Sequence, residues 1–423
     1  MNLTNYRINT ERLHKTIKEL ATFGKNEKGG LDRTTFTKAE LAAREWLKES
    51  LINMNLQVKV DEAANIWARR EGKASQLPAI TFGSHIDTVP NGGQYDGALG
   101  VLIALEVMKV LEENKITTYH PFELVSFSAE EPNPFGLSTF GSRAITGRLK
   151  KKDIEQVIDS NGNVLTEALT RAGGDPDAFE SAVRSPNEIG AYLEVHIEQG
   201  KRLLNKHIPV GVVTAITGIY REEVTVLGEA NHAGTTLMED RKDSLTAASE
   251  MVLALERVCS RYPENEVVGT IGKMNVSPNS ANIIPAEVSF TLEIRGKTKE
   301  EIKEVLSLWE DEVNEIQLKR KIGLQRSVLL DQAPAPMSQL LIEQTEKVTK
   351  ELGYESLLLG SMAGHDATHM ASITNSGMIF VPSVDGKSHC PEEFSTIEDI
   401  EKVANVFLNT LLAIDQKLIT ENS

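Results

Sequence analysis

Two spacings of hydrophobic residues alternate along the first half of the chain. Short continuous apolar runs, typical of buried strands, are followed by stretches in which apolar residues recur every three or four positions, as on one face of a helix. The predicted strands are 56–60, 66–70, 78–82, 121–127 and 191–195. The predicted helices are 9–23, one that begins after Thr37, and 101–111. Strands that alternate with helices in this way predict an α/β sheet.

The pattern becomes β-rich near Pro209. The predicted elements there are strands at 212–216, 223–227, 267–271 and 287–295, with helices at 244–258 and 302–316. This order is that of a small α+β layer. We therefore predict an inserted α+β domain, 210–332, within an α/β domain made of 1–209 and 333–423. The larger domain resumes with a helix at 339–352, a strand at 378–381 and a helix at 397–414.

Composition and charge narrow the class of protein. The 423 residues are too many for one ordinary hydrophobic core, which again predicts two domains. The net charge of −16 disfavours nucleic acid and anionic membranes as partners, but it does not exclude a small anionic substrate. Cys259 and Cys390 make no disulfide framework, and no apolar run has the length of a leader or a membrane span. We therefore expect a cytoplasmic protein.

Side chains that bind metals follow several predicted strands. His85, Asp87 and Asp96 lie on a glycine-rich loop after the strand at 78–82, and open α/β sheets place their ligand sites at such strand ends. The other strand ends carry Glu130 with Glu131, His196, and His389. Imidazoles and carboxylates gathered at one sheet edge predict a site for divalent metal.

The donors suffice for two metal ions that share one carboxylate. His85, Asp96 and His196 could hold one ion, and Asp96, Glu131 and His389 the other, although spacing leaves the assignment of the non-bridging ligands open. Mixed nitrogen and oxygen ligation suits zinc or manganese, with cobalt or nickel as alternatives. Asp87 could orient the His85 ring, or it could be an ordinary turn residue.

Glu130 precedes Glu131 on a strand end, where neighbouring side chains point to different sides. One carboxylate can therefore bind metal while the other stays free as a general base. The competing interpretation is a solvated acidic turn, which the preceding buried strand disfavours.

Six segments together resemble the M20-type dinuclear metal hydrolases, and more narrowly their carbamoylase and ureido-hydrolase branch. That branch includes N-carbamoyl-L-amino acid hydrolases, β-ureidopropionase, allantoate amidohydrolase and ureidoglycolate amidohydrolase. The resemblance runs from about residue 10 to the C-terminus. The segments are Ser84-His-Ile-Asp with Tyr95-Asp-Gly, Glu130-Glu131, Val195-His-Ile-Glu-Gln-Gly200, Asn231-His-Ala-Gly234 and Ser388-His-Cys-Pro-Glu392.

The resemblance implies a role for each matching residue. The implied metal ligands are His85, Asp96, Glu131, His196 and His389, with Asp96 as the bridge. Glu130 matches the general base, and His232 matches an imidazole that stabilises the oxyanion. The implied substrate contacts are Gln199, Asn282, Arg295 and His365. The resemblance also implies a mixed-sheet metallohydrolase catalytic domain, 1–209 and 333–423, with 210–332 as its lid and dimerisation domain. The family is usually homodimeric through that lid domain.

Without the resemblance, several of these residues have plainer interpretations. Arg295 could pair with Glu293 at the surface, and His232 could be an ordinary loop histidine. His365 and His369 are spaced to bind metal on one helix, but the ligand set is complete without His369.

The implied reaction is hydrolysis of the ureido amide of a linear ureido acid, in first place an N-carbamoyl-L-amino acid, to ammonia, carbon dioxide and the amino acid. Pro132 and the segment 235–238 resemble the ureidoglycolate-type enzymes, so ureidoglycolate and allantoate remain close candidates. The alternatives are an M20-type dipeptidase or aminoacylase, and a non-catalytic binding protein on the same scaffold.

Overall fold

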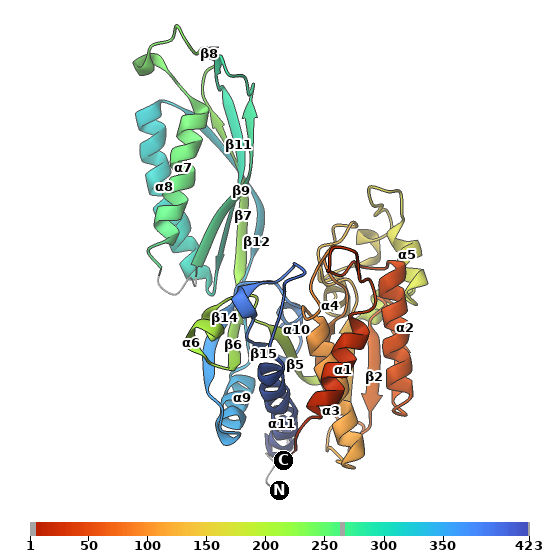
Figure 1. The fold of residues 1–423 in the computed structure, drawn as a ribbon. Helices are drawn as coiled ribbons and strands as arrows, with labels where there is room; N and C mark the ends of the chain where they lie inside the picture. Colours follow the sequence, from red (N-terminus) through yellow and green to blue (C-terminus); the bar gives the residue numbers. More distant parts are fainter. Residues whose placement is uncertain (1–5, 263–266, 422–423) are drawn as a thin grey trace. The chain divides into compact units, whose positions relative to one another are not determined.

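The computed structural model describes residues 6–262 and 267–421, and the chain divides into two compact units (Figure 1). Unit 1 comprises 1–214, 336–359 and 365–423, and unit 2 comprises 215–335 and 360–364. Each unit has its own sheet and its own buried core, and each is described separately.

Unit 1 is built on a mixed sheet in the order β1-β2-β4-β3-β5-β15-β6-β13, with β14 paired to β6. The predicted strands correspond to β1 to β5 and β15. The bounds are β1 Gln57–Val60, β2 Ile66–Arg70, β3 Ala79–His85, β4 Phe122–Phe127, β5 Ile189–Ile197, β6 Val210–Ile216, β13 Ala335–Pro336, β14 Ser356–Ser361 and β15 Asn375–Val381.

The middle of this sheet is parallel. Strand β3 pairs in parallel with both β4 and β5, and β5 pairs in parallel with β15. Nearly every residue of these four strands is buried, as expected for parallel strands covered on both faces. Their carboxyl ends therefore lie along one edge, and the chain leaves that edge towards His85, Glu130, His196 and His389.

The first two helices of unit 1 begin at residues whose side chains accept a free backbone amide. The Asn9 side chain accepts a hydrogen bond from Arg12 N at the start of α1, and Thr37 accepts one from Glu40 N at the start of α2. Helix α3 is apolar on nearly all sides because it is buried against β3 and β5. The bounds are α1 Thr10–Leu20, α2 Lys38–Ile52, α3 Ala98–Glu113, α4 Phe140–Ile145, α5 Leu165–Arg171, α6 Arg202–Lys206, α9 Gln339–Glu351, α10 Ala367–Met370 and α11 Ile397–Glu421.

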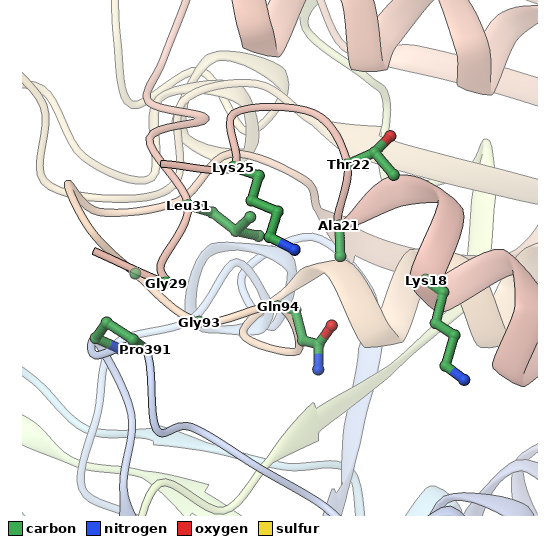
Figure 2. A pocket seen from close by; sticks show the side chains of 10 residues that line it. Lys18, Ala21, Thr22, Lys25, Gly29, Leu31, Gly93, Gln94 and Pro391 are labelled. Carbon is green, nitrogen blue, oxygen red and sulfur yellow. The ribbon is translucent and has the colours of Figure 1, made fainter. Parts of the chain in front are cut away.

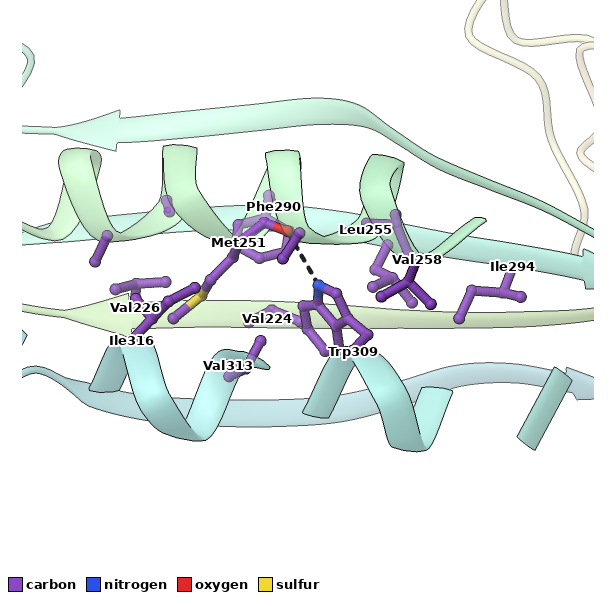
Figure 3. Close-up of a cluster of buried hydrophobic side chains, with 14 of the residues drawn as sticks. Val224, Val226, Met251, Leu255, Val258, Phe290, Ile294, Trp309, Val313 and Ile316 are labelled. Atoms are coloured by element: carbon purple, nitrogen blue, oxygen red, sulfur yellow. Dashed lines mark hydrogen bonds between the residues drawn. The ribbon is translucent and has the colours of Figure 1, made fainter. Parts of the chain in front are cut away.

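Unit 2 has an antiparallel sheet in the order β12-β7-β11-β9, with two long helices against one face (Figure 1). Trp309 is fully buried in the core between sheet and helices, and its Nε1 donates to the Met251 carbonyl at 3.0 Å (Figure 3). The indole nitrogen is thereby satisfied within an otherwise apolar cluster. The bounds are β7 Gly218–Leu227, β8 Asn231–His232, α7 Ser244–Cys259, β9 Val267–Ser277, β10 Ile283–Ile284, β11 Glu287–Gly296, α8 Lys299–Arg320 and β12 Gly323–Gln332.

The observed boundaries differ from the predicted 210–332. Strand β6 starts at Val210 but pairs with β15 of the larger sheet, so unit 2 starts five residues later than predicted and ends at Ala335. The segment 360–364 also belongs to unit 2, because its backbone accepts hydrogen bonds from residues such as Thr217. In the part of the chain that the structure describes, no helix is both long and apolar enough to cross a bilayer.

Candidate active site

His85 is the last residue of β3, and its orientation is fixed by the loop that follows. Its Nδ1 donates to the Asp87 carbonyl at 3.1 Å, which leaves the Nε2 lone pair directed at the site. The Nε2 atom lies 3.7 Å from Asp96 Oδ1 and 3.6 Å from Glu130 Oε2. Gly97 allows this approach, because its φ is +61° and a Cβ there would lie 2.1 Å from His85 Nε2.

His196, at the end of β5, completes a first group of donors. Its Nδ1 lies 3.0 Å from the Ile197 carbonyl, so its Nε2 also faces inward, 3.2 Å from Asp96 Oδ1. His85, Asp96 and His196 are all buried and offer donor atoms within 4.8 Å of one another. Three convergent donors of this kind suit a metal ion.

A second group shares Asp96 with the first. His389 Nε2 lies 3.4 Å from Asp96 Oδ2 and 3.5 Å from Glu131 Oε1. These three residues also offer donor atoms within 4.8 Å of one another. Glu131 Oε1 is buried and has no hydrogen-bond partner, which is a costly state for a carboxylate oxygen unless a cation satisfies it. The two donor groups thus meet at the single carboxylate of Asp96.

The buried carboxylates at the site lie close enough to repel one another. Burial raises the pKa of Glu131 to about 8, and Asp96 adds to the shift. Burial would also raise the pKa of Asp96, but His196 and His389 hold it well below its ordinary value. A divalent ion would neutralise this repulsion among carboxylates. The donor set therefore fits divalent metal, with nitrogen and oxygen ligands from four strand ends.

Asp87 connects the two halves of the site. Its Oδ1 and Oδ2 accept the backbone amides of Glu130 and Glu131, each at 3.2 Å, and Oδ2 also accepts the Thr35 hydroxyl at 2.9 Å. Oδ1 lies 3.4 Å from His85 Nδ1. Asp87 is thus close enough to orient the His85 ring, as one of the two sequence interpretations held, and it also anchors the segment that carries both glutamates.

Glu130 belongs to neither donor group, yet it lies beside them. Burial raises its pKa well above its ordinary value, and neighbouring Glu131 adds to the rise while His85 opposes it. A carboxylate with raised proton affinity, 3.6 Å from a metal-facing imidazole, is suited to accept a proton near neutral pH. The acidic-turn interpretation is wrong, because only 9% of the Glu130 surface is exposed.

Two of the predicted substrate contacts also lie at this site. Gln199 Nε2 donates to Asp96 Oδ2 at 2.6 Å, so its side chain packs on the shared carboxylate. The His365 ring lies edge-on to the His196 ring at 4.5 Å and is buried. Burial lowers the pKa of His365 well below its ordinary value, with His196 adding to the effect. His365 is therefore neutral beside the donor groups.

The sequence interpretation missed two residues that hold Asp96. Glu393 is buried, and its Oε1 accepts the backbone amides of Tyr95 at 2.8 Å and Asp96 at 3.0 Å. The Ser388 hydroxyl lies 2.6 Å from Asp96 Oδ2 and 2.9 Å from Glu393 Oε2. Both residues flank His389, so proximity to a candidate ligand was the one available signal.

The remaining predicted residues lie in unit 2. His232 Nδ1 accepts the amides of Gly234 at 3.0 Å and Thr235 at 3.2 Å, so the neutral ring carries its proton on Nε2. Asn282 lies directly before β10, which pairs with β8 of the same chain. Its backbone carbonyl accepts the amide of Ala233 at 3.0 Å. An exposed imidazole with a fixed Nε2–H can act as a hydrogen-bond donor to an external group.

Arg295 lies at the opposite end of β11 from His232 and Asn282. Its Nε donates to Glu293 Oε1 at 2.8 Å and its Nη1 to the Met362 carbonyl at 2.9 Å. The surface pair with Glu293 is therefore present. From Glu287 to Arg295 the strand extends about 27 Å at the usual rise per residue. Arg295 and the His232–Asn282 pair are thus too far apart within one unit 2 to touch the same small molecule.

A hollow of about 310 Å³ lies beside the loop that carries Asp96 (Figure 2). Lys18, Lys25, Gly93, Gln94 and Pro391 are among the residues that line it. Gly93 has no room for a side chain, since a Cβ would lie 2.2 Å from Glu393 Oε1. The residues that line the hollow belong to neither donor group, but Gly93 in its wall lies against the side chain of Glu393.

A mixed α/β sheet whose parallel strands bring two histidine–carboxylate groups together on one aspartate, next to a free buried glutamate, defines a metal-dependent hydrolase. The comparisons with known proteins give the family. The chain belongs to peptidase family M20/M25/M40, whose pattern matches residues 81–413.

Relatives cover nearly the whole chain. An N-carbamoyl-L-amino acid amidohydrolase of Geobacillus stearothermophilus is 37% identical over 409 residues, which are 97% of this chain and 99% of that protein. An allantoate amidohydrolase of Bacillus subtilis is 35% identical, covering 91% of this chain and 93% of that protein. The crystal structure of a hydantoinase/carbamoylase family amidase from Burkholderia multivorans has a TM-score of 0.88 at 31% identity, covering 96% of this chain and 98% of that one. The family resemblance stated from the motifs is confirmed.

Proposed function

We propose that this protein is an amidohydrolase that cleaves the ureido group of a linear ureido acid, in first place an N-carbamoyl-L-amino acid. The observation that carries the proposal is the pair of donor groups that meet at the buried Asp96, with Glu130 outside both groups and 3.6 Å from His85 Nε2. The full-length similarity to an N-carbamoyl-L-amino acid amidohydrolase supports the choice of substrate class. Allantoate and ureidoglycolate are the next candidates.

In the proposed reaction, Glu130 takes a proton from the attacking water and later delivers it to the leaving nitrogen. Its raised proton affinity suits both steps. His232 donates its Nε2–H to the oxyanion that forms at the ureido carbonyl. Arg295 binds the substrate carboxylate through its planar guanidinium, and Gln199, Asn282 and His365 contact the ureido group.

We propose two divalent ions, zinc or manganese, with His85 and His196 on one side of Asp96 and Glu131 and His389 on the other. When bound, such ions polarise a carbonyl and make water a nucleophile at neutral pH. Glu131 Oε1, which is buried and accepts no hydrogen bond, is the strongest sign that the second group needs a cation. Because both cysteines are free thiols, we place the enzyme in a reducing compartment, the cytoplasm.

We further propose a homodimer joined through unit 2. Arg295 and the His232–Asn282 pair lie at opposite ends of one strand, so a single chain cannot bring both to one small substrate. A second copy of the chain can supply the His232–Asn282 pair to a substrate that Arg295 of the first copy binds. The test is to mix the Glu130→Gln and His232→Ala variants: if His232 acts on the partner's site, one site of each mixed dimer carries neither change and activity returns. Activity that stays absent in the mixture would show that His232 serves its own chain.

The deciding experiment for the reaction is a screen for ammonia release by metal-reconstituted protein. The substrates are N-carbamoyl-L-amino acids, allantoate and ureidoglycolate, with N-acetyl amino acids and dipeptides as the test of the aminoacylase and dipeptidase alternatives. Because the last two classes yield no ammonia, they are scored by release of the free amino acid. We expect turnover of ureido acids only. The matched controls are Glu130→Gln, expected to keep metal and lose activity by about 10²- to 10⁴-fold, and Glu131→Gln, expected to lose metal. Inactivity on all ureido acids with full metal content would refute the proposal.

A further inference from the structure

The segment that delivers Glu130 is held by the residues at the start of α4. Gly141 N donates to the Ser128 carbonyl at 2.9 Å, Phe140 N to the Ala129 carbonyl at 3.0 Å, and Thr139 N to the Glu130 carbonyl at 2.7 Å. Asp87 holds the amide of Glu130 on the other side. The last of the three bonds is the one that reaches Glu130 itself, so the conformation of Thr139 bears directly on the position of the base.

Thr139 adopts a conformation that its side chain disfavours. Its φ of +47° and ψ of +36° are left-handed, which is rare for a β-branched residue. Ala129, on the facing segment, also has a positive φ, of +52°. Such conformations cost of order 1–3 kcal/mol and persist only where surrounding contacts impose them. Some neighbouring group must therefore hold Thr139 in place.

That group is His369. Its Nε2 lies 2.9 Å from Thr139 Oγ1, and the same hydroxyl lies 2.8 Å from the Ser138 carbonyl. Because the hydroxyl proton goes to the carbonyl, Thr139 Oγ1 accepts the Nε2–H of His369. His369 is 7% exposed, and burial lowers its pKa to about 3, helped by Arg148 and Arg143. The ring is therefore neutral, and its proton on Nε2 is used by Thr139.

His369 also lies close in the chain to a residue at the donor groups. His369 is in helix α10, and His365, whose ring contacts His196, lies two residues before that helix and accepts the amide of Thr368 at 3.0 Å. The segment 365–369 thus contacts a candidate metal ligand at its start and the support of the base at its end. The sequence interpretation had left His369 without a role because the ligand set was complete without it.

We propose that His369 is a positioning residue for Glu130, acting through the hydroxyl of Thr139 to fix the backbone on which Glu130 is carried. The inference rests on the proposed role of Glu130 as the base. His369 contacts no residue of the donor groups directly, so we expect its loss to act through the backbone segment that carries Glu130.

The experiment compares His369→Phe, which keeps a ring but removes the donor, with His369→Gln, whose amide N–H can replace it. Thr139→Val removes the hydroxyl and keeps the side-chain shape, which covers the case in which His369→Phe does not fold. His14→Phe, a ring replacement on α1, is the matched control. Each holoenzyme is measured for kcat, KM and metal content, and for amide hydrogen exchange in peptides that span 128–141.

At saturating metal, we expect His369→Phe and Thr139→Val to lower kcat by about tenfold to a hundredfold, with KM unchanged. Exchange at 128–141 should be faster in both, and the double variant should be no worse than the worse single one. His369→Gln should restore both readouts. Unchanged exchange in His369→Phe, or an equal kcat loss in His369→Gln, would overturn the inference. If the wild-type protein hydrolyses no ureido acid, the proposed function fails, whereas the exchange data still decide whether His369 holds this segment.

Discussion

At the scale of single residues, the candidate site depends on one place where only glycine fits. Gly97 has a positive φ, and its Cα faces the Nε2 atom of His85 at a distance that admits no further carbon. The same residue follows Asp96 and precedes the first turn of α3. The close packing of backbone on imidazole therefore sets where His85 and Asp96 meet.

The first prediction is that Gly97→Ala lowers metal affinity at least tenfold, because the added methyl group displaces the His85 ring. The measurement is metal content after dialysis against a graded chelator. Gly136→Ala is the matched control: Gly136 also has a positive φ, of +72°, but has nothing within 4 Å of its Cβ position. Both variants carry the backbone strain, so equal metal loss in both would show that strain alone is responsible.

The second prediction concerns the support of Asp96. Glu393→Ala removes the acceptor for the amides of Tyr95 and Asp96 and a partner of Ser388, so we expect metal affinity to fall by about 10- to 100-fold while the fold persists. The measurement is isothermal titration of the metal-free protein with Zn²⁺ and Mn²⁺. The neighbouring Glu392 is exposed, so Glu392→Ala should bind as the wild type does. Normal affinity in Glu393→Ala would contradict the role given to its carboxylate.

These residues also show what the sequence could predict of the site. His85, Glu131 and His196 each follow a continuous apolar run, and a strand end can be recognised from such a run. Glu393 and His369 could not be predicted in this way, because they act through hydrogen bonds to residues far away in the chain. The spacing of hydrophobic residues does not indicate such a hydrogen bond, because donor and acceptor come together only in the folded chain.

At the scale of elements, burial decides which strands the sequence reveals. The parallel strands β3, β4 and β5 were predicted because both of their faces are apolar. Strand β12 was not predicted, because it is an edge strand of unit 2 whose residues are mostly exposed. An edge strand is held by backbone pairing on one side, which requires no particular side-chain pattern.

The helices of unit 2 provide the third prediction. Glu250 of α7 accepts hydrogen bonds from Arg320 Nε at 2.8 Å and Nη2 at 2.6 Å, and so joins α7 to α8. These bonds lower the pKa of Glu250 to about 2. A carboxylate with a lowered pKa stabilises the fold above its unfolded pKa of 4.5, and the contribution is lost as the pH falls towards 2. Because both side chains are partly exposed and solvent screens the pair, we expect no more than about 1 kcal/mol.

The measurement is urea unfolding with and without Glu250→Gln, in a background in which Trp46 and Trp67 of unit 1 are replaced by Phe, so that the fluorescence reports Trp309 in the core of unit 2. The Glu250→Gln variant should be less stable at pH 6, and the difference should shrink on acidification. Glu256→Gln, at an exposed position of the same helix, should show no such trend. A difference that is constant between pH 6 and pH 3 would show that the ion pair does not stabilise unit 2.

At the scale of the whole molecule, each of the two units has its own core and carries its own set of candidate functional residues. Unit 1 carries both donor groups and Glu130, while unit 2 carries His232, Asn282 and Arg295. The core of unit 2 packs around Trp309 and includes no residue of the donor groups. The energetics of metal binding should therefore be confined to one of the two units.

The last prediction follows from this separation. A ligand that binds only the native state stabilises it by about 2.7 kcal/mol at a hundredfold excess over its dissociation constant. Adding Zn²⁺ or Mn²⁺ to metal-free protein should thus slow amide exchange in peptides of β3, β4 and β5, and leave peptides of α7 and α8 unchanged. Asp96→Asn weakens the carboxylate that both groups share, so it should abolish the effect. If metal protected α7 and α8 equally, the two cores would be unfolding as one cooperative unit, and the site would be stabilising the whole chain rather than the sheet that holds it.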